Sequence, residues 1–194
     1  VVRVWDLSAE RPVAVLPTKS LSYVTALSCD AGAPSVFVAG CSDGALRFFD
    51  ARCRPGEALV AAVRDHAAAL IGVHWQAASR RAVLSAASSG NVRLWDVRSG
   101  TCLVVLGGRM GHGDEVLSLD MHRSGAWLAS ASMDHAVKIW DLRAAGCQRD
   151  FHFGSMVRSV CLHPNQAELI VGLQNGFIKV WDLEANHIVQ EVQP

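Results

Sequence analysis

One stretch of the chain carries a histidine, a serine and an aspartate, the side chains that a hydrolase combines to activate a serine nucleophile. These are His112, Ser130 and Asp134, and Trp140 follows them. In a hydrolase the histidine would take the serine proton and the aspartate would orient the histidine. The sequence holds no G-x-S-x-G elbow and no recognisable oxyanion loop. A structural role is therefore favoured, because a buried indole N–H and a buried imidazole both need hydrogen-bond partners.

The other chemistry-bearing residues form no metal or cofactor pattern in the sequence. The six cysteines include no C-x-x-C pair, and none stands beside an H-x-x-x-H pattern, which argues against zinc. There is also no glycine-rich phosphate loop or paired carboxylate cluster. We predict no metal, no cofactor, no catalytic residue and no enzyme activity. Several cysteines lie in apolar runs, as small buried thiols do, and we expect an intracellular protein, cytoplasmic or nuclear.

Charge and hydropathy restrict the partners. The chain has 194 residues with 18 basic and 18 acidic side chains, and therefore no formal net charge. It lacks the bulk positive charge that draws proteins to nucleic acid or to an anionic membrane. No apolar run approaches the length of a membrane span. We expect other proteins as partners, and neither nucleic acid nor membrane.

An aromatic residue followed by aspartate recurs along the whole chain. The pairs begin at positions 5, 49, 95, 140 and 181, so the spacings are 44, 46, 45 and 41 residues. Each pair ends a short alternating run, such as VRVWD or VKIWD, which predicts a strand. Turn residues such as Ser42-Asp43-Gly44 precede the run, and a further apolar run precedes the turn, as in a hairpin. No segment shows helical periodicity over ten or more residues, so the chain is predicted to be all-β.

The aromatic-Asp pair, its period and the Gly-His before the fourth pair resemble the WD-repeat family over nearly the whole chain. The resemblance implies a β-propeller built from four-stranded blades. We expect one domain, 1–194, with four complete four-stranded blades plus a half-blade. The half-blade is placed at 1–17 and the blades at about 20–65, 66–107, 111–153 and 154–194. Because the repeats start midway through a blade, we expect an incomplete, chimeric or assembled propeller, whose open blade edges belong to a longer ring or self-associate.

In the WD-repeat family, four residues of one blade form a hydrogen-bond relay. The resemblance assigns this structural relay to His112, Ser130, Asp134 and Trp140. The other repeats keep only part of the set. The first complete blade has Asp43 but Phe49 for tryptophan, the second has His66, Ser85 and Trp95 but Ser89 for aspartate, and the last has Trp181 with Asn175 and Val171.

Arginine follows three of the aromatic-Asp pairs, at Arg52, Arg98 and Arg143. The stretch LASASMDHAVKIWDLR, which ends at Arg143, resembles the box by which WD-repeat substrate receptors dock the adaptor of a cullin-RING ubiquitin ligase. The resemblance makes Arg98 and Arg143 candidate partner contacts, because a guanidinium offers a fixed charged fork. An ordinary exposed arginine after a strand is the alternative. Two tryptophans outside the pairs, Trp75 and Trp127, are either partner contacts or core residues.

Three stretches resemble particular WD-repeat families. Residues 16–52, through VTALSC and VFVAG, resemble the C-terminal propeller of the Raptor family, the scaffold of the TOR kinase complex, and a weaker likeness continues to about 96. Residues 93–142, through SMDHAVKIW, resemble the Polycomb family of EED. Residues 157–187, through VCLHPNQAELIVG, are similar to the small all-propeller subunit of the TOR complex.

These resemblances lead to three functional interpretations. The first is a non-catalytic WD-repeat protein-interaction scaffold, TOR-complex-like. The second is a substrate receptor of a cullin-RING ubiquitin ligase. The third is an engineered chimeric or fragment propeller with no evolved partner. A defined symmetric assembly of this short chain in solution would favour that interpretation.

Overall fold

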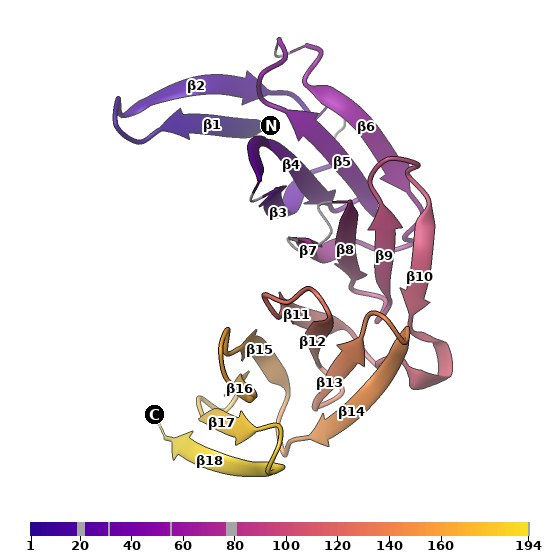
Figure 1. Ribbon diagram of the computed structural model, residues 1–194, viewed down its shortest axis with the longest axis vertical. Helices are drawn as coiled ribbons and strands as arrows, with labels where there is room; N and C mark the ends of the chain where they lie inside the picture. Colours follow the sequence, from indigo (N-terminus) through magenta and orange to yellow (C-terminus); the bar gives the residue numbers. More distant parts are fainter. Residues whose placement is uncertain (19–21, 31, 55, 77–80, 194) are drawn as a thin grey trace.

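The computed structural model describes residues 1–18, 22–30, 32–54, 56–76 and 81–193, and its regular structure is β-strand apart from one short 3-10 turn, η1 (Gly108–Met110) (Figure 1). The strands form one two-stranded hairpin and four four-stranded antiparallel sheets, each in sequence order. The hairpin consists of β1 (Val2–Asp6) and β2 (Arg11–Leu16). The first sheet consists of β3 (Val24–Asp30), β4 (Ala33–Cys41), β5 (Ala45–Asp50) and β6 (Leu59–Arg64), and the second of β7 (Leu70–Trp75), β8 (Ala82–Ala87), β9 (Val92–Asp96) and β10 (Cys102–Leu106). The third sheet consists of β11 (Val116–Met121), β12 (Trp127–Ser132), β13 (Ala136–Asp141) and β14 (Gly146–His152), and the fourth of β15 (Val157–Leu162), β16 (Glu168–Leu173), β17 (Ile178–Asp182) and β18 (His187–Val192).

The sheets follow one another along an arc (Figure 1). The first strand of each four-stranded sheet lies on the concave side of the arc, and the fourth lies on the convex side. The inner strands of neighbouring sheets contact one another, β3 with β7, β7 with β11 and β11 with β15. This arrangement confirms the prediction of an all-β chain with four four-stranded blades plus a half-blade.

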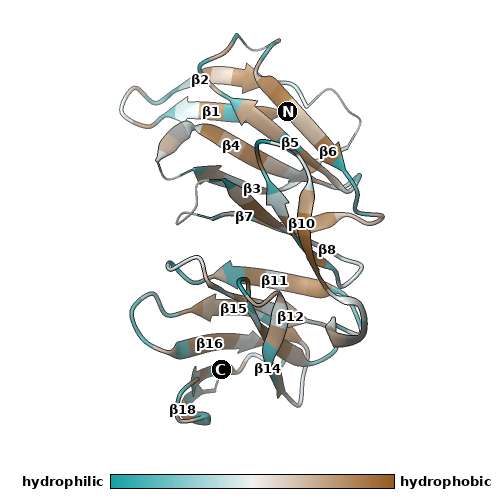
Figure 2. Ribbon diagram, turned by 45° about the vertical axis from the view of Figure 1, so that its right-hand side comes forward, coloured by the Kyte–Doolittle hydropathy of each residue, from teal (hydrophilic) through white to brown (hydrophobic). Residues whose placement is uncertain are grey.

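Apolar side chains fill the spaces between neighbouring sheets, in four clusters. Hydrophobic residues accordingly gather on the strands, and hydrophilic ones on many of the connecting turns (Figure 2). Every residue of β8 is buried, because that strand has another sheet on each face. Leu84 belongs to the cluster shared with the third sheet, and its neighbour Val83 to the cluster shared with the first. The unbroken apolar run of such a strand therefore reflects burial on both faces.

The aspartate of each aromatic-Asp pair closes the turn that follows it. Asp141 Oδ1 accepts hydrogen bonds from the backbone N–H groups of Arg143 (2.8 Å) and Ala144 (3.2 Å). Carboxylates favour turns of this kind because they can bond their own backbone two residues on. In the four-stranded sheets the aromatic member of the pair packs between sheets while the aspartate sets the next turn, whereas Trp5 of the hairpin is 53% exposed. The equivalent aspartates, which also accept a backbone N–H two residues on, are Asp6, Asp50, Asp96 and Asp182.

A polar side chain at one position of three inner strands links each strand to the next. These bonds are directional, so they set the register between sheets that apolar packing alone leaves loose. Ser28 Oγ accepts the N–H of Trp75 (2.8 Å), His74 Nε2 donates to the carbonyl oxygen of Leu119 (3.1 Å), and Asp120 Oδ2 accepts the N–H of Leu162 (2.7 Å).

Candidate functional site

The four relay residues of the third sheet form one hydrogen-bonded chain. The indole N–H of Trp140 donates to Ser130 Oγ (2.8 Å), which lies 2.6 Å from His112 Nε2. The other ring nitrogen, Nδ1, lies 2.9 Å from Asp134 Oδ2, and that oxygen also accepts the N–H of Gly113 (2.9 Å). Because a carboxylate only accepts, the imidazole carries its proton on Nδ1, and the Ser130 hydroxyl donates to Nε2.

The relay has the proton arrangement of a catalytic triad, but a substrate cannot reach its serine or its histidine. Ser130 is completely buried, and so is the side chain of His112. A nucleophile must contact the substrate, and its base must lie within reach of the transferred proton. The Ser130 oxygen is shielded from solvent and already accepts the Trp140 N–H. The geometry therefore satisfies buried polar groups and supports a structural role.

Burial and the carboxylate act in opposite directions on the relay histidine. Burial lowers the pKa of His112, and the hydrogen bond to Asp134 partly offsets that effect. For Asp134, burial acts to raise the pKa, but the N–H of Gly113 and the His112 ring outweigh burial, and the pKa is lowered. Both shifts favour a neutral imidazole beside an ionised carboxylate at neutral pH.

The second sheet holds a relay of three members. His66 Nε2 lies 2.8 Å from Ser85 Oγ, and the indole N–H of Trp95 donates to the same oxygen (2.8 Å). With serine rather than aspartate in the turn, His66 lacks the carboxylate that His112 has. Burial accordingly lowers the pKa of His66 to about 4.

We predict that acidification destabilises the chain and that His66 accounts for much of the loss. A histidine whose pKa is lowered by folding stabilises the fold fully above the unfolded pKa of about 6.5, and that contribution is lost as the pH falls toward the folded value. With a folded pKa of about 4, the expected loss between pH 6.5 and pH 5 is about 2 kcal/mol. Urea titrations at several pH values measure the loss.

The variant His66→Gln should flatten this pH dependence, because the titrating group is gone. His187→Gln, which replaces an exposed histidine of β18, serves as the control and should keep the parent curve. A slope that is unchanged in His66→Gln would contradict the prediction.

In the first sheet an ion pair stands in place of the relay. Arg47 Nη1 and Nη2 lie 3.0 and 2.6 Å from the two carboxylate oxygens of Asp43, and hydrogen bonding to Arg47 lowers the pKa of that carboxyl. Ala39 and Phe49 occupy the serine and tryptophan positions, and Phe49 stacks on Phe37 with ring centroids 5.1 Å apart. Neither Ala39 nor Phe49 has a polar side-chain atom, so these two positions leave no buried donor without an acceptor.

In the fourth sheet the indole N–H has lost its acceptor. Val171 takes the serine position, opposite Lys179. Phe153 lies against Trp181, with ring centroids 6.1 Å apart, where the third sheet has His112 against its tryptophan. Trp181 Nε1 is buried and has no hydrogen-bond partner among the described residues. An unpaired buried donor of this kind costs about 1–3 kcal/mol.

A basic residue that the sequence reasoning did not single out recurs two residues before the aromatic of each pair. The runs LRFFD, VRLWD, VKIWD and IKVWD show it directly. Its acidic partners are not visible in the sequence, because they come from another strand or loop. The ion pairs are Arg47 with Asp43, Arg93 with Asp65, Lys138 with Asp150 and Lys179 with Glu191.

The three arginines after the aromatic-Asp pairs lie in exposed turns but differ in their contacts. Arg52 Nη2 lies 2.6 Å from Asp50 Oδ2, and its Nε lies 2.9 Å from Oδ1, so its guanidinium is held by that carboxylate. Within the described ranges, the guanidinium groups of Arg98 and Arg143 have no hydrogen-bond or ion-pair partner, and only their backbone N–H groups bond the preceding aspartates. Both residues are exposed.

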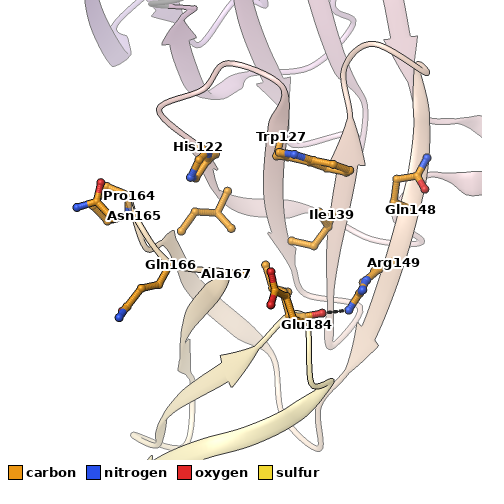
Figure 3. Close-up of a pocket in the computed structure, with 12 residues that line it drawn as sticks. His122, Trp127, Ile139, Gln148, Arg149, Pro164, Asn165, Gln166, Ala167 and Glu184 are labelled. Carbon is orange, nitrogen blue, oxygen red and sulfur yellow. Dashed lines mark hydrogen bonds between the residues drawn. The ribbon is translucent and has the colours of Figure 1, made fainter.

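The two tryptophans outside the pairs have different environments. Trp75 is a core residue, 6% exposed, and meets Phe48 edge to face with ring centroids 6.2 Å apart. Trp127 is 40% exposed and lines a pocket between the third and fourth sheets (Figure 3). The sequence reasoning named Trp127 but missed the pocket, because the facing wall comes from turns of the next sheet.

The described part of the chain contains no group of three or more His, Cys, Asp or Glu side chains placed to hold a metal ion. All six cysteines are free thiols. Within the same residues, no helix has the length and apolar character needed to cross a membrane.

Comparison with known proteins finds similar repeats in other proteins. The family model "WD domain, G-beta repeat" matches residues 100–141 and 147–182. The chain is 33% identical over 141 residues to the target of rapamycin complex 1 subunit mip1 of Schizosaccharomyces pombe. This alignment covers 73% of this chain and 10% of mip1. It is 38% identical over 109 residues to the target of rapamycin complex subunit LST8 of Mus musculus (55% of this chain, 33% of LST8). It is 33% identical over 122 residues to the Polycomb group protein FIE1 of Oryza sativa subsp. japonica (62% of this chain, 32% of FIE1).

These matches confirm the resemblances to TOR-complex subunits and to a Polycomb WD-repeat protein. The chain spans about a tenth of the length of mip1 and about a third of the length of LST8 and of FIE1. The matched repeats contain the third sheet with its complete relay and most of the fourth sheet. The third sheet and most of the fourth therefore match the WD-repeat model, and the strand order of the first two sheets is the same.

Proposed function

We propose that this chain is a non-catalytic protein-interaction scaffold that acts within a TOR complex. The observation that carries the proposal is the similarity to mip1, a target of rapamycin complex 1 subunit, over 73% of the chain. The similarity to LST8, a subunit of the same kind of complex, supports it. The non-catalytic part rests on the relay, whose serine and histidine are buried and already satisfied. A rigid β-scaffold with variable turns suits the presentation of contact residues to other proteins.

Co-precipitation tests the proposed partner. The tagged chain should bring down TOR kinase from a lysate of an organism that has the complex. The FIE1 segment that matches this chain is the control, since it shares the repeats but carries a Polycomb name. Kinase recovery with this chain and not with the FIE1 segment is the expected result. Equal recovery with both, or with neither, would reject a TOR-complex role.

A second candidate function is a substrate receptor of a cullin-RING ubiquitin ligase. The guanidinium groups of Arg98 and Arg143, which are exposed and have no partner within the described part of the chain, favour it. This function predicts that Arg143→Ala weakens binding of the ligase adaptor about tenfold, as loss of a buried interface arginine does. Arg52→Ala is the matched control, because Asp50 already holds its guanidinium in an equivalent turn. Adaptor affinity measured by titration calorimetry separates the outcomes. Equal affinities for both variants and the parent would exclude this contact.

Self-association and assembly from propeller fragments stay proposals. The similarity to mip1 extends over 141 residues, which is longer than the stretch 16–96 that resembles the Raptor family. This supports a continuous origin for most of the chain.

The outer strands expose apolar side chains, among them Val60, Leu103 and Val105, that a second copy could cover. Light scattering at high protein concentration decides the oligomeric state, and a clean monomer would reject self-association.

A further inference from the structure

A pocket of about 560 Å³ lies between the third and fourth sheets (Figure 3). Its lining residues lie in or beside the turns that join β11 to β12, β15 to β16 and β17 to β18, and on strands β13 and β14. The volume falls within the range of ligand-binding pockets, about 300–1,000 Å³. The pocket lies beside the apolar cluster between the third and fourth sheets, which includes Ile139 and Leu162, and none of the four relay residues lines it.

Apolar side chains form the inner part of the pocket. Ile139 and Leu162 are buried, and Ala167 and Leu183 are half-buried. The indole of Trp127, 40% exposed, forms a further part of the wall. A partly exposed aromatic beside buried aliphatic groups has the composition of an anchor site for an apolar side chain.

Side-chain amides surround this apolar part, from the exposed residues Gln148, Asn165 and Gln166. An amide both donates and accepts, which complements a peptide group with its one N–H and one C=O. Arg149 and Glu184, of opposite charge, also line the pocket, so the rim offers no excess charge to select an ionic ligand. The lining therefore matches an uncharged backbone segment that carries a bulky apolar side chain.

Bonds between the two sheets hold the walls in place. Arg149 Nη1 donates to the carbonyl oxygen of Leu183, and Arg123 Nη1 donates to Asn165 Oδ1 (3.0 Å). The hydrogen bond from the Leu162 N–H to the carboxylate of Asp120 on β11 fixes the inner end of the pocket. A pocket between two linked sheets is largely formed before its ligand arrives, which reduces the ordering cost of binding.

We propose that this pocket binds an extended segment of a partner protein. One bulky apolar side chain of the segment enters beside Trp127, and the neighbouring peptide groups pair with the amides of Gln148 and Gln166. The proposal rests on the scaffold function proposed above and assigns a contact surface to it.

Blocked tripeptides test the pocket directly. The probes are acetyl-Gly-Trp-Gly-amide and acetyl-Gly-Gly-Gly-amide, titrated into the chain while the methyl signals of Ile139, Leu162 and Leu183 are followed by NMR. The tryptophan peptide should give saturable shifts at these methyls, with an apparent affinity at least about tenfold higher than that of the glycine peptide.

Two variants should reduce this affinity by different routes. Trp127→Ala removes the aromatic wall, and Ala167→Phe fills the space from the opposite side, each with a loss of about fivefold or more. Leu103→Ala removes an exposed apolar side chain of β10, outside the pocket, and should leave the affinity unchanged. Ala167→Phe keeps the test valid if Trp127→Ala unfolds.

The outcomes are distinct. Equal shifts with both peptides, or shifts that persist in a folded Ala167→Phe variant, would overturn the proposal. Methyl shifts that grow with chain concentration in the absence of peptide would assign the pocket to a second copy of the chain instead, which also overturns it. The peptides contain no TOR subunit, so the two proposals fail separately: peptide binding without kinase recovery rejects the partner, and kinase recovery without peptide binding rejects the pocket.

Discussion

Replacing Gly44 by valine is expected to lower the free energy of unfolding by about 3–5 kcal/mol. Gly44 lies in the turn between β4 and β5 with φ at 76°, a left-handed conformation that disfavours β-branched residues. A Cβ atom at this position would lie 2.3 Å from the carbonyl oxygen of His66 and 2.9 Å from that of Ala68. Those carbonyls belong to backbone that leads into the next sheet, so the clash forces the first and second sheets apart.

Urea denaturation at pH 7 measures the loss, and Gly56→Ala is the matched control. Gly56 also lies in a turn, but a Cβ there meets no atom within 4 Å and the backbone is not left-handed. The control should lie within about 0.5 kcal/mol of the parent. A Gly44→Val variant as stable as the control would show that the two sheets do not approach each other in this way.

Replacing Ser130 by alanine is expected to destabilise the chain by about 2–4 kcal/mol. The hydroxyl is the shared partner of Trp140 Nε1 and His112 Nε2, at 2.8 and 2.6 Å. Its removal leaves two buried polar groups unpaired, and each such group costs about 1–3 kcal/mol. The third sheet, which has the complete relay, would then resemble the fourth, where the Trp181 indole has no acceptor among the residues that the structure describes.

A double-mutant cycle with Trp140→Phe isolates the hydrogen bond from the packing. Ser130→Ala should cost about 1 kcal/mol less in the Trp140→Phe background than in the parent, because no indole N–H remains to be left unpaired. The first sheet has the residues of the double variant, because Ala39 and Phe49 stand at the positions of Ser130 and Trp140. Ser99→Ala, at an exposed hydroxyl, is the control. Strictly additive effects of the two relay substitutions would contradict the observed bond.

The hydrogen bonds among the four relay residues depend on information that the repeat itself carries. His112, Ser130, Asp134 and Trp140 stand at positions that recur in every repeat, so their alignment in one sheet follows from strand order. The same reasoning identified Val171 as a departure, and its consequence is that the Trp181 N–H has no acceptor among the described residues. The acidic partners of the recurring basic residues could not be predicted in this way, because they do not come from one place: Asp65 comes from a loop, whereas Asp150 and Glu191 come from outer strands.

By itself the sequence determined the strands, the turns and the repeat of the four-stranded sheets, because alternation, turn residues and the aromatic-Asp pair act within one repeat. Only the tertiary structure decided how neighbouring sheets meet. It buried Trp75, left Trp127 at the wall of a pocket and set Gly44 against the carbonyl of His66. Among the described residues, it left the guanidinium groups of Arg98 and Arg143 without a partner, while Arg52 is held by Asp50. Most of these differences depend on contacts between residues far apart in the chain, where packing and burial, rather than local pattern, determine which side chain is enclosed and which can bind a partner.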